Sequence, residues 1–175
     1  MALERFGIIK FRGQDATVVG ADLKLGETAP EFSAQTLEWA AFKGLTDTRG
    51  KVRIIASVPS LDTDVCDRET RRFNQEAASL GKDIAILVIS TDLPYAQKRW
   101  CGAAGVDQLT VLSDHMAVDF GLKYGCLIKE ARLLRRAVFV VDRAGKLVYV
   151  AYMPALGVEP AYDAVLEAAR AALVG

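Results

Sequence analysis

The sequence predicts an α/β fold whose central sheet is buried on both faces. Two runs of strand length, VRIIASV (residues 52–58) and IAILVIS (residues 84–90), are apolar almost throughout. Such runs are typical of strands that helices cover on both sides. Each is followed by a segment of helical periodicity, so strands and helices alternate after Gly50. The chain has 175 residues, 51% hydrophobic and 25% charged, and we expect one domain that spans residues 1–175.

The first fifty residues are expected to form strands and turns. Residues 4–20 contain two short apolar stretches around Gly13-Gln14-Asp15, which predicts a β-hairpin. Residues 25–45 are rich in turn-forming residues, and we expect a single short strand there, at Phe32–Gln35. The hairpin precedes the alternating region, so it would be an N-terminal extension of the main fold.

The alternating region predicts two main helices. Residues 93–104 fit one of them, with Pro94 at an early position where its missing N–H costs little. A short strand at residues 109–114 and a short helix at residues 116–124 are expected to follow. The other helix, at residues 65–80, has an apolar face whose members recur at spacings of three and four: Cys66, Thr70, Phe73, Ala77 and Leu80.

The last forty residues predict a second hairpin and a closing helix. Two apolar strands within residues 136–153 flank the turn sequence Asp142–Gly145, and residues 159–174 are amphipathic. The predicted order is therefore hairpin, βαβ, αβ and ββα. That order is the thioredoxin-like fold with an N-terminal β-hairpin extension, in which parallel crossovers are right-handed.

Charge and hydropathy exclude several classes of function. The formal net charge is zero, so the chain has no basic field to attract nucleic acid or an anionic membrane. The longest apolar runs are of strand length and too short to span a bilayer. Charged residues interrupt the N-terminal segment MALERFGIIKFRG, where a signal peptide needs an apolar core. We therefore expect a cytoplasmic protein.

The cysteines indicate redox chemistry or burial rather than a structural framework. There are three, an odd number, widely spaced and without a CxxC pair. The only histidine is His115, so a zinc site is disfavoured and we expect no metal. In a reducing compartment, such cysteines are either small buried side chains or reactive thiols.

Cys66 has the strongest claim to reactivity. It would lie in the first turn of the helix at residues 65–80, where free N–H groups and the helix dipole favour a thiolate. Pro59 would fix the chain where the preceding strand ends and help to shield the sulfur. Thr63 could turn its hydroxyl towards the sulfur or an incoming oxygen. Arg136 opens an apolar strand, and a charge there needs a partner, which a thiolate could provide.

The residues taken singly also allow structural roles. Cys66 could be a core thiol or half of a structural disulfide. Thr63 could cap the helix, as could Asp62 or Asp64. Arg136 could pair with a carboxylate instead of a thiolate. Spacing alone leaves the choice open.

Several longer motifs resemble the thiol peroxidase subfamily of peroxiredoxins, the atypical 2-Cys type. They include Pro59-xxx-Thr63-xx-Cys66 in PSLDTDVCDRETRRFNQEAA, DLPYAQKRWC at residues 92–101, FGLKYG, and RAVFVVDRAGKLVYV. The likeness runs from about residue 4 to the C-terminus. It implies a thiol-dependent peroxidase without a cofactor that reduces hydrogen peroxide and alkyl hydroperoxides in antioxidant defence.

The same resemblance assigns roles to residues. It implies that Cys66 is the peroxidatic cysteine, in a pocket completed by Pro59, Thr63 and Arg136. It also implies that Cys101 is the resolving cysteine, which forms a disulfide with the Cys66 sulfenic acid. Because these cysteines would belong to different helices, local unwinding is expected if their Cα atoms are more than about 7 Å apart. Thioredoxin is the implied reductant, and the implied assembly is a homodimer.

Some positions depart from the family pattern. Asp64 replaces a small residue or proline, and Asp67 follows Cys66 directly. Carboxylates so close should raise the pKa of the thiol, whereas the helix terminus and Arg136 should lower it, and the sequence leaves the net direction open. Arg135 stands where the family has a small residue, which favours Arg136 of the adjacent pair as the functional arginine. Cys126 has no family role and is expected to be buried. The competing functions are a thiol–disulfide oxidoreductase acting on proteins, which the missing CxxC disfavours, and a non-enzymatic binding module.

Overall fold

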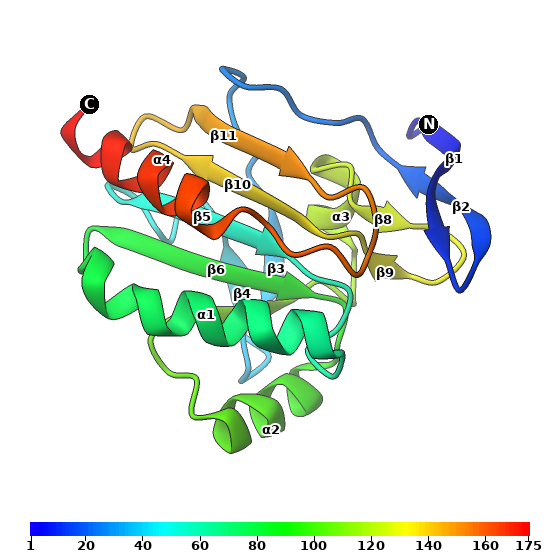
Figure 1. Ribbon diagram of the computed structural model, residues 1–175, viewed down its shortest axis with the longest axis horizontal. Coiled ribbons are helices and arrows are strands. Elements are labelled where there is room, and N and C mark those ends of the chain that lie inside the picture. The colour runs from blue at the N-terminus through cyan, green and yellow to red at the C-terminus, as the bar shows by residue number, and fades with distance from the viewer.

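The computed structural model describes all 175 residues and contains a central seven-stranded sheet (Figure 1). The strands lie in the order β11-β10-β5-β6-β7-β3-β4. The central strands β5, β6 and β7 are parallel, whereas β10 is antiparallel to β5 and β3 is antiparallel to β7. The bounds are β3 Ser33–Gln35, β4 Ala41–Lys43, β5 Val52–Ser57, β6 Ile84–Ser90, β7 Thr110–Ser113, β10 Ala137–Val141 and β11 Leu147–Tyr152.

Both faces of this sheet are covered, as the apolar runs predicted. Alternate residues of β5 face opposite sides: Ile54 packs with helices α1 and α4, and Ile55 packs with α3. The helices are α1 Asp64–Leu80, α2 Pro94–Ala104, α3 Asp119–Lys123 and α4 Tyr162–Val174. Helices α1 and α4 run along the same face of the sheet (Figure 1).

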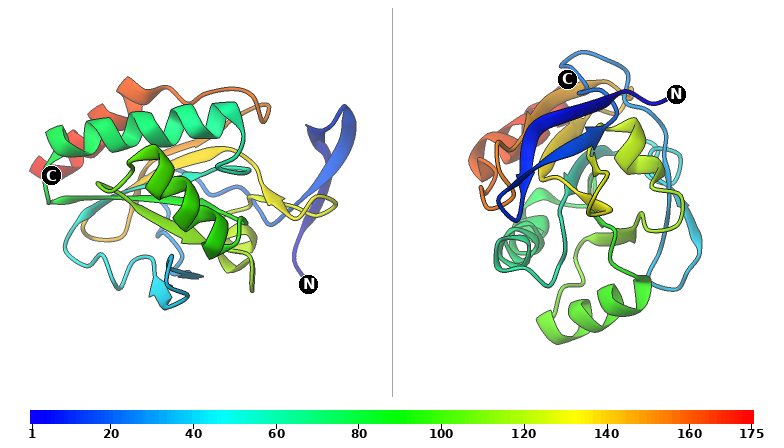
Figure 2. Two further views of the ribbon diagram at one scale, coloured as in Figure 1. Left: turned by 90° about the horizontal axis from the view of Figure 1, so that it is seen from below. Right: turned by 90° about the vertical axis from the view of Figure 1, so that its right-hand side faces the viewer.

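A second, smaller sheet lies at one end of the molecule (Figure 2). It contains the antiparallel pair β1 Glu4–Phe11 and β2 Gln14–Val19, at the place where a hairpin was expected. The short strands β8 Leu127–Ile128 and β9 Leu133–Leu134 extend this hairpin. The sequence did not predict β4, β8 or β9, which are strands of two or three residues that form only by pairing with other strands.

The predicted helix at residues 116–124 is shorter in the structure. Helix α3 begins only at Asp119, because Val118 has a left-handed backbone conformation (φ 46°) that a regular helix cannot include. The carboxylate of Asp114 accepts hydrogen bonds from the N–H groups of Phe120 (3.0 Å) and Gly121 (2.8 Å), and so satisfies donors of the first turn. The closing helix likewise begins at Tyr162 and not at residue 159.

None of the four helices combines the length and the apolar character that crossing a bilayer would require.

Candidate active site

The loop between β5 and α1 is anchored to the exit of the neighbouring strand. Asp92 follows β6, and its carboxylate accepts hydrogen bonds from the Ser60 hydroxyl (2.7 Å) and the Leu61 N–H (2.9 Å). Pro59 is buried at the start of this loop. The loop is therefore held at the carboxyl edge of two adjacent parallel strands, where sites of α/β sheets are usually built.

Cys66 lies in the first turn of α1 and is fully buried. Its Sγ atom accepts a hydrogen bond from Nη2 of Arg136 at 3.1 Å. The positive end of the helix and a guanidinium group thus lie next to the same sulfur. A thiolate is the nucleophilic form of cysteine.

Arg136 is fixed from several directions. It precedes β10, whose first residue Ala137 pairs with Ser57 at the end of β5, so its side chain starts beside the Cys66 loop. Its Nε and Nη2 atoms donate to the carbonyl oxygen of Leu156 at 3.1 Å and 2.9 Å, and its Nη1 atom donates to Glu69. With only 1% of its surface exposed, the guanidinium is held in place by these bonds.

Glu69 is the member of this site that the sequence analysis missed. It is fully buried on α1, with one carboxylate oxygen on Arg136 and the other, Oε1, without a partner. Burial raises the pKa of its carboxyl group to about 7, although Arg136 opposes the shift. A signal was present, because Glu69 lies three residues after Cys66 and so shares its helix face. Arg136 therefore contacts both a thiol and a carboxylate, the two partners that the sequence had left as alternatives.

Thr63 does not have the orientation that the sequence analysis expected. Its backbone occupies the N-cap position of α1, but its side chain makes no capping hydrogen bond. The hydroxyl donates instead to the carbonyl oxygen of Ser60 at 2.8 Å, and the residue is exposed. The backbone turn that begins at Ser60 provides this nearer acceptor, so the hydroxyl does not point at the sulfur.

Cys101 lies on α2, in the same apolar cluster as Cys66. It is buried, and burial raises the pKa of its thiol. All three cysteines are free thiols in this structure. The structure therefore shows the reduced protein, with Cys66 and Cys101 on separate helices.

Cys126 and Arg135 form a separate buried arrangement. Burial raises the pKa of Cys126 to about 12, and its Sγ lies 3.5 Å from the carbonyl oxygen of Tyr124. Arg135 donates to Gly125 and Asp22 and lies over the ring of Tyr152. Of the two adjacent arginines, only Arg136 contacts Cys66.

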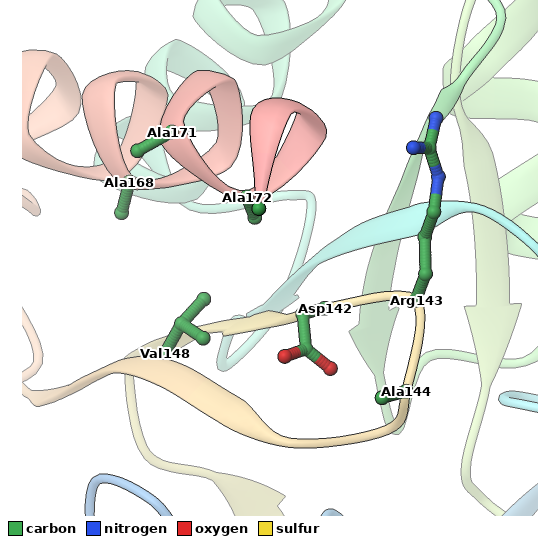
Figure 3. Close-up of a pocket in the computed structure, with 8 residues that line it drawn as sticks. Asp142, Arg143, Ala144, Val148, Ala168, Ala171 and Ala172 are labelled. Carbon is green, nitrogen blue, oxygen red and sulfur yellow. The ribbon is translucent and has the colours of Figure 1, made fainter.

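A hollow of about 410 Å³ lies elsewhere (Figure 3). It is bounded by the β10–β11 turn at residues 142–144 and by alanines of α4. This turn is at the opposite end of β10 from Arg136, and no cysteine lines the hollow. No group of three or more histidine, cysteine, aspartate or glutamate side chains is placed to hold a metal ion.

Comparisons with known proteins agree in the family they point to. Residues 25–150 match the AhpC/TSA family. The chain is 50% identical to the thiol peroxidase of Oceanobacillus iheyensis, over 90% of this chain and 95% of that protein. It is also 50% identical to the thiol peroxidase of Bacillus subtilis, over 93% of this chain and 96% of that protein. The crystal structure of a peroxiredoxin-like protein from Aquifex aeolicus superposes with a TM-score of 0.85 at 38% identity, covering 94% of this chain and 96% of that one.

Proposed function

The chain belongs to the AhpC/TSA family and is a peroxiredoxin-type, thiol-dependent peroxidase, and we propose that Cys66 is the residue that attacks the peroxide. The predicted resemblance to thiol peroxidases and the predicted thioredoxin-like fold are both confirmed by the comparisons. One observation carries the assignment of Cys66. A buried guanidinium lies 3.1 Å from its sulfur in the first turn of a helix, and neither other cysteine has this environment.

The first chemical step is nucleophilic substitution at oxygen. The Cys66 thiolate attacks one oxygen of a hydroperoxide, and a sulfur–oxygen bond forms as the oxygen–oxygen bond breaks. The leaving alkoxide takes a proton from water and departs as an alcohol, or as water when the substrate is hydrogen peroxide. Arg136 stabilises the negative charge as it moves from sulfur to the leaving oxygen. Cys66 becomes a sulfenic acid.

Cys101 is the proposed resolving residue. Its thiol attacks the sulfenic sulfur of Cys66, a disulfide forms, and water leaves. The two cysteines lie on separate helices, α1 and α2, and we expect this step to involve local unwinding around them wherever their Cα atoms are more than about 7 Å apart. Thioredoxin would then reduce the disulfide by thiol–disulfide exchange.

Pro59 and Thr63 have supporting roles in this proposal. The buried ring of Pro59 removes one backbone donor and helps to exclude water from the loop beside Cys66. The Thr63 hydroxyl reaches a bound peroxide oxygen only after it rotates away from the Ser60 carbonyl that it contacts in the reduced protein. We expect this rotation when substrate binds.

The proposal extends to substrates and partners. Hydrogen peroxide and alkyl hydroperoxides are the proposed substrates, and antioxidant defence in the cytoplasm is the proposed role. The proposed assembly is a homodimer. Exposed apolar residues suited to such an interface include Leu93 and Val158.

Intact mass and peptide mapping test the assignment. One equivalent of cumene hydroperoxide is added to the fully reduced protein. We expect the loss of two hydrogens per chain and a cross-linked peptide that contains Cys66 and Cys101. In Cys101→Ser, we expect one added oxygen on Cys66 instead.

Two other outcomes would change the assignment. An oxygen adduct on Cys66 in the wild-type protein, without a cross-link, would remove Cys101 from its role. An unreacted Cys66 would contradict its assignment and favour exchange with protein disulfides as the activity of the pair.

A further inference from the structure

Helices α1 and α2 lie next to each other (Figure 1), and a small polar cluster joins them beside the two cysteines. The indole N–H of Trp100 donates a hydrogen bond to Oδ1 of Asp67 at 2.9 Å. Arg71, one turn further along α1, donates to the other oxygen of Asp67 at 2.8 Å. Its guanidinium also lies 5.7 Å from the centre of the Trp100 ring and donates to the carbonyl oxygen of Ala104 at 3.3 Å. We call Asp67, Arg71 and Trp100 the interhelical clamp.

The clamp joins the sequence neighbours of the two cysteines. Asp67 directly follows Cys66, and Trp100 directly precedes Cys101. Successive side chains on a helix point about 100° apart. While Asp67 bonds to Trp100 of α2, the Cys66 side chain points about 100° away around the helix, and its sulfur contacts Arg136 in the core. The Asp67–Trp100 hydrogen bond thus fixes the rotation of the first turn of α1 at which the Cys66 sulfur contacts Arg136.

We propose that the interhelical clamp is a positioning device that holds the reduced, peroxide-reactive arrangement and must open before Cys66 and Cys101 can form their disulfide. This inference rests on the proposed function, in which those two cysteines pair. Rotating Cys66 towards α2 unwinds the first turn of α1, and Asp67 lies in that turn. The Asp67–Trp100 hydrogen bond must then break, so its free energy adds to the barrier for resolution but not to the barrier for attack on peroxide.

The first test is Trp100→Phe, which removes the indole donor and keeps the Asp67 charge. Stopped-flow kinetics of the reduced protein with cumene hydroperoxide separate two steps, a peroxide-dependent one and a peroxide-independent one. We expect the peroxide-independent step, disulfide formation, to become about three- to tenfold faster, the effect of losing one partly exposed charge-assisted hydrogen bond. The peroxide-dependent rate constant should change by less than about twofold, since Cys66 and Arg136 are untouched.

Trp39→Phe is the matched control. Trp39 packs against Tyr95 and His115 and takes no part in the clamp, so both steps should keep their wild-type rates. This variant also leaves Trp100 as the only tryptophan. Its emission should change in the peroxide-independent step, because the indole loses its carboxylate partner there.

A double-mutant cycle distinguishes the hydrogen bond from general loosening of α2. Asp67→Asn keeps the shape of the side chain but weakens the bond, so alone it should accelerate resolution by less than Trp100→Phe does. In the Trp100→Phe background, Asp67→Asn should have no further effect on resolution, because the bond is already absent. Its effect on the peroxide step, through the charge near Cys66, should be the same in both backgrounds.

Three results would overturn the inference. These are unchanged or slower disulfide formation in Trp100→Phe, additive effects on resolution in the cycle, and Trp100 emission that is the same in the reduced and disulfide forms. Peptide mapping of the same samples identifies the cause. If Trp100→Phe forms the Cys66–Cys101 cross-link at the wild-type rate, the clamp is rejected but the proposed pairing stands. If the wild-type protein does not form this cross-link, both the pairing and the clamp are rejected.

Discussion

Cys66 and Cys126 are both fully buried, but their surroundings differ. The difference lies in the contacts of two adjacent arginines, Arg135 and Arg136. Cys66 receives a hydrogen bond from Arg136 and lies at a helix N-terminus. Cys126 lies near a backbone carbonyl, while the Arg135 guanidinium is engaged with Gly125 and Asp22. Burial is the main cause that raises the pKa of Cys126 to about 12 and leaves it a thiol, although Arg135 opposes the shift.

In the proposed function, burial alone does not decide whether a cysteine reacts, because both of these cysteines are buried and only Cys66 is assigned to attack peroxide. The two sites differ in whether a guanidinium donates a hydrogen bond to the sulfur, and that depends on which way each arginine points. Successive residues of an extended chain point to opposite sides. Arg135 and Arg136 therefore serve different regions although they are neighbours in sequence.

The largest expected difference is in catalysis. Cys66→Ser should lower the rate of peroxide reduction to about a thousandth or less, since the attacking atom is lost. Cys126→Ser should keep that rate within about twofold and should lower stability, because a hydroxyl replaces a buried apolar thiol. A peroxidase assay with thioredoxin and a urea melt of each variant measure both effects. A large loss of activity in folded Cys126→Ser would contradict the comparison.

The second expected effect concerns the two arginines. Arg136→Lys keeps a charge opposite Glu69, but a single ammonium cannot reproduce the fork that also reaches Cys66 and Leu156. We expect kcat/KM for hydroperoxide to fall about 100-fold, the cost of losing one positioned charge-stabilising donor.

Arg135→Lys is the matched control for that variant. We expect nearly wild-type kcat/KM and a loss of about 1 kcal/mol in the free energy of unfolding, from the bonds to Gly125 and Asp22. Equal losses of activity in the two variants would show that the arginines do not have separate roles.

The smallest expected effect is a pH dependence of stability at Glu69. Its pKa is raised from 4.5 to about 7 in the folded protein, so the folded state binds more protons between these values than the unfolded state does. The contribution of the protonated Glu69 carboxyl group to the free energy of unfolding is fully present below pH 4.5 and is lost as the pH rises through 7. Glu69→Gln removes the titration. The free energy of unfolding of Glu69→Gln relative to wild type should therefore increase by on the order of 2 kcal/mol from pH 4.5 to pH 7.5.

Urea melts of both proteins at the two pH values provide the measurement. If the difference in the free energy of unfolding between the two proteins were the same at both pH values, Glu69 would stay ionised throughout. The Arg136 contact would then outweigh burial of the carboxylate.

Most of the architecture could be predicted because it is encoded locally. The apolar runs in β5 and β6 and the three- and four-residue spacing in α1 report burial directly, and these three elements lie within one residue of the predicted bounds. Strands β8 and β9 could not be predicted, because two residues form a strand only when distant partners such as Val18 and Leu134 pair with them.

The candidate site divides in the same way. The sequence by itself determined which residues to consider at the β5–α1 junction, because a strand exit, a helix start and a cysteine in its first turn are local features. Only the tertiary structure decided that Arg136 contacts both Cys66 and Glu69, that the Thr63 hydroxyl bonds to Ser60, and that Trp100 reaches Asp67. Most of these contacts join residues far apart in the chain, and the direction of a side chain depends on the packing of whole elements. No local pattern records that packing.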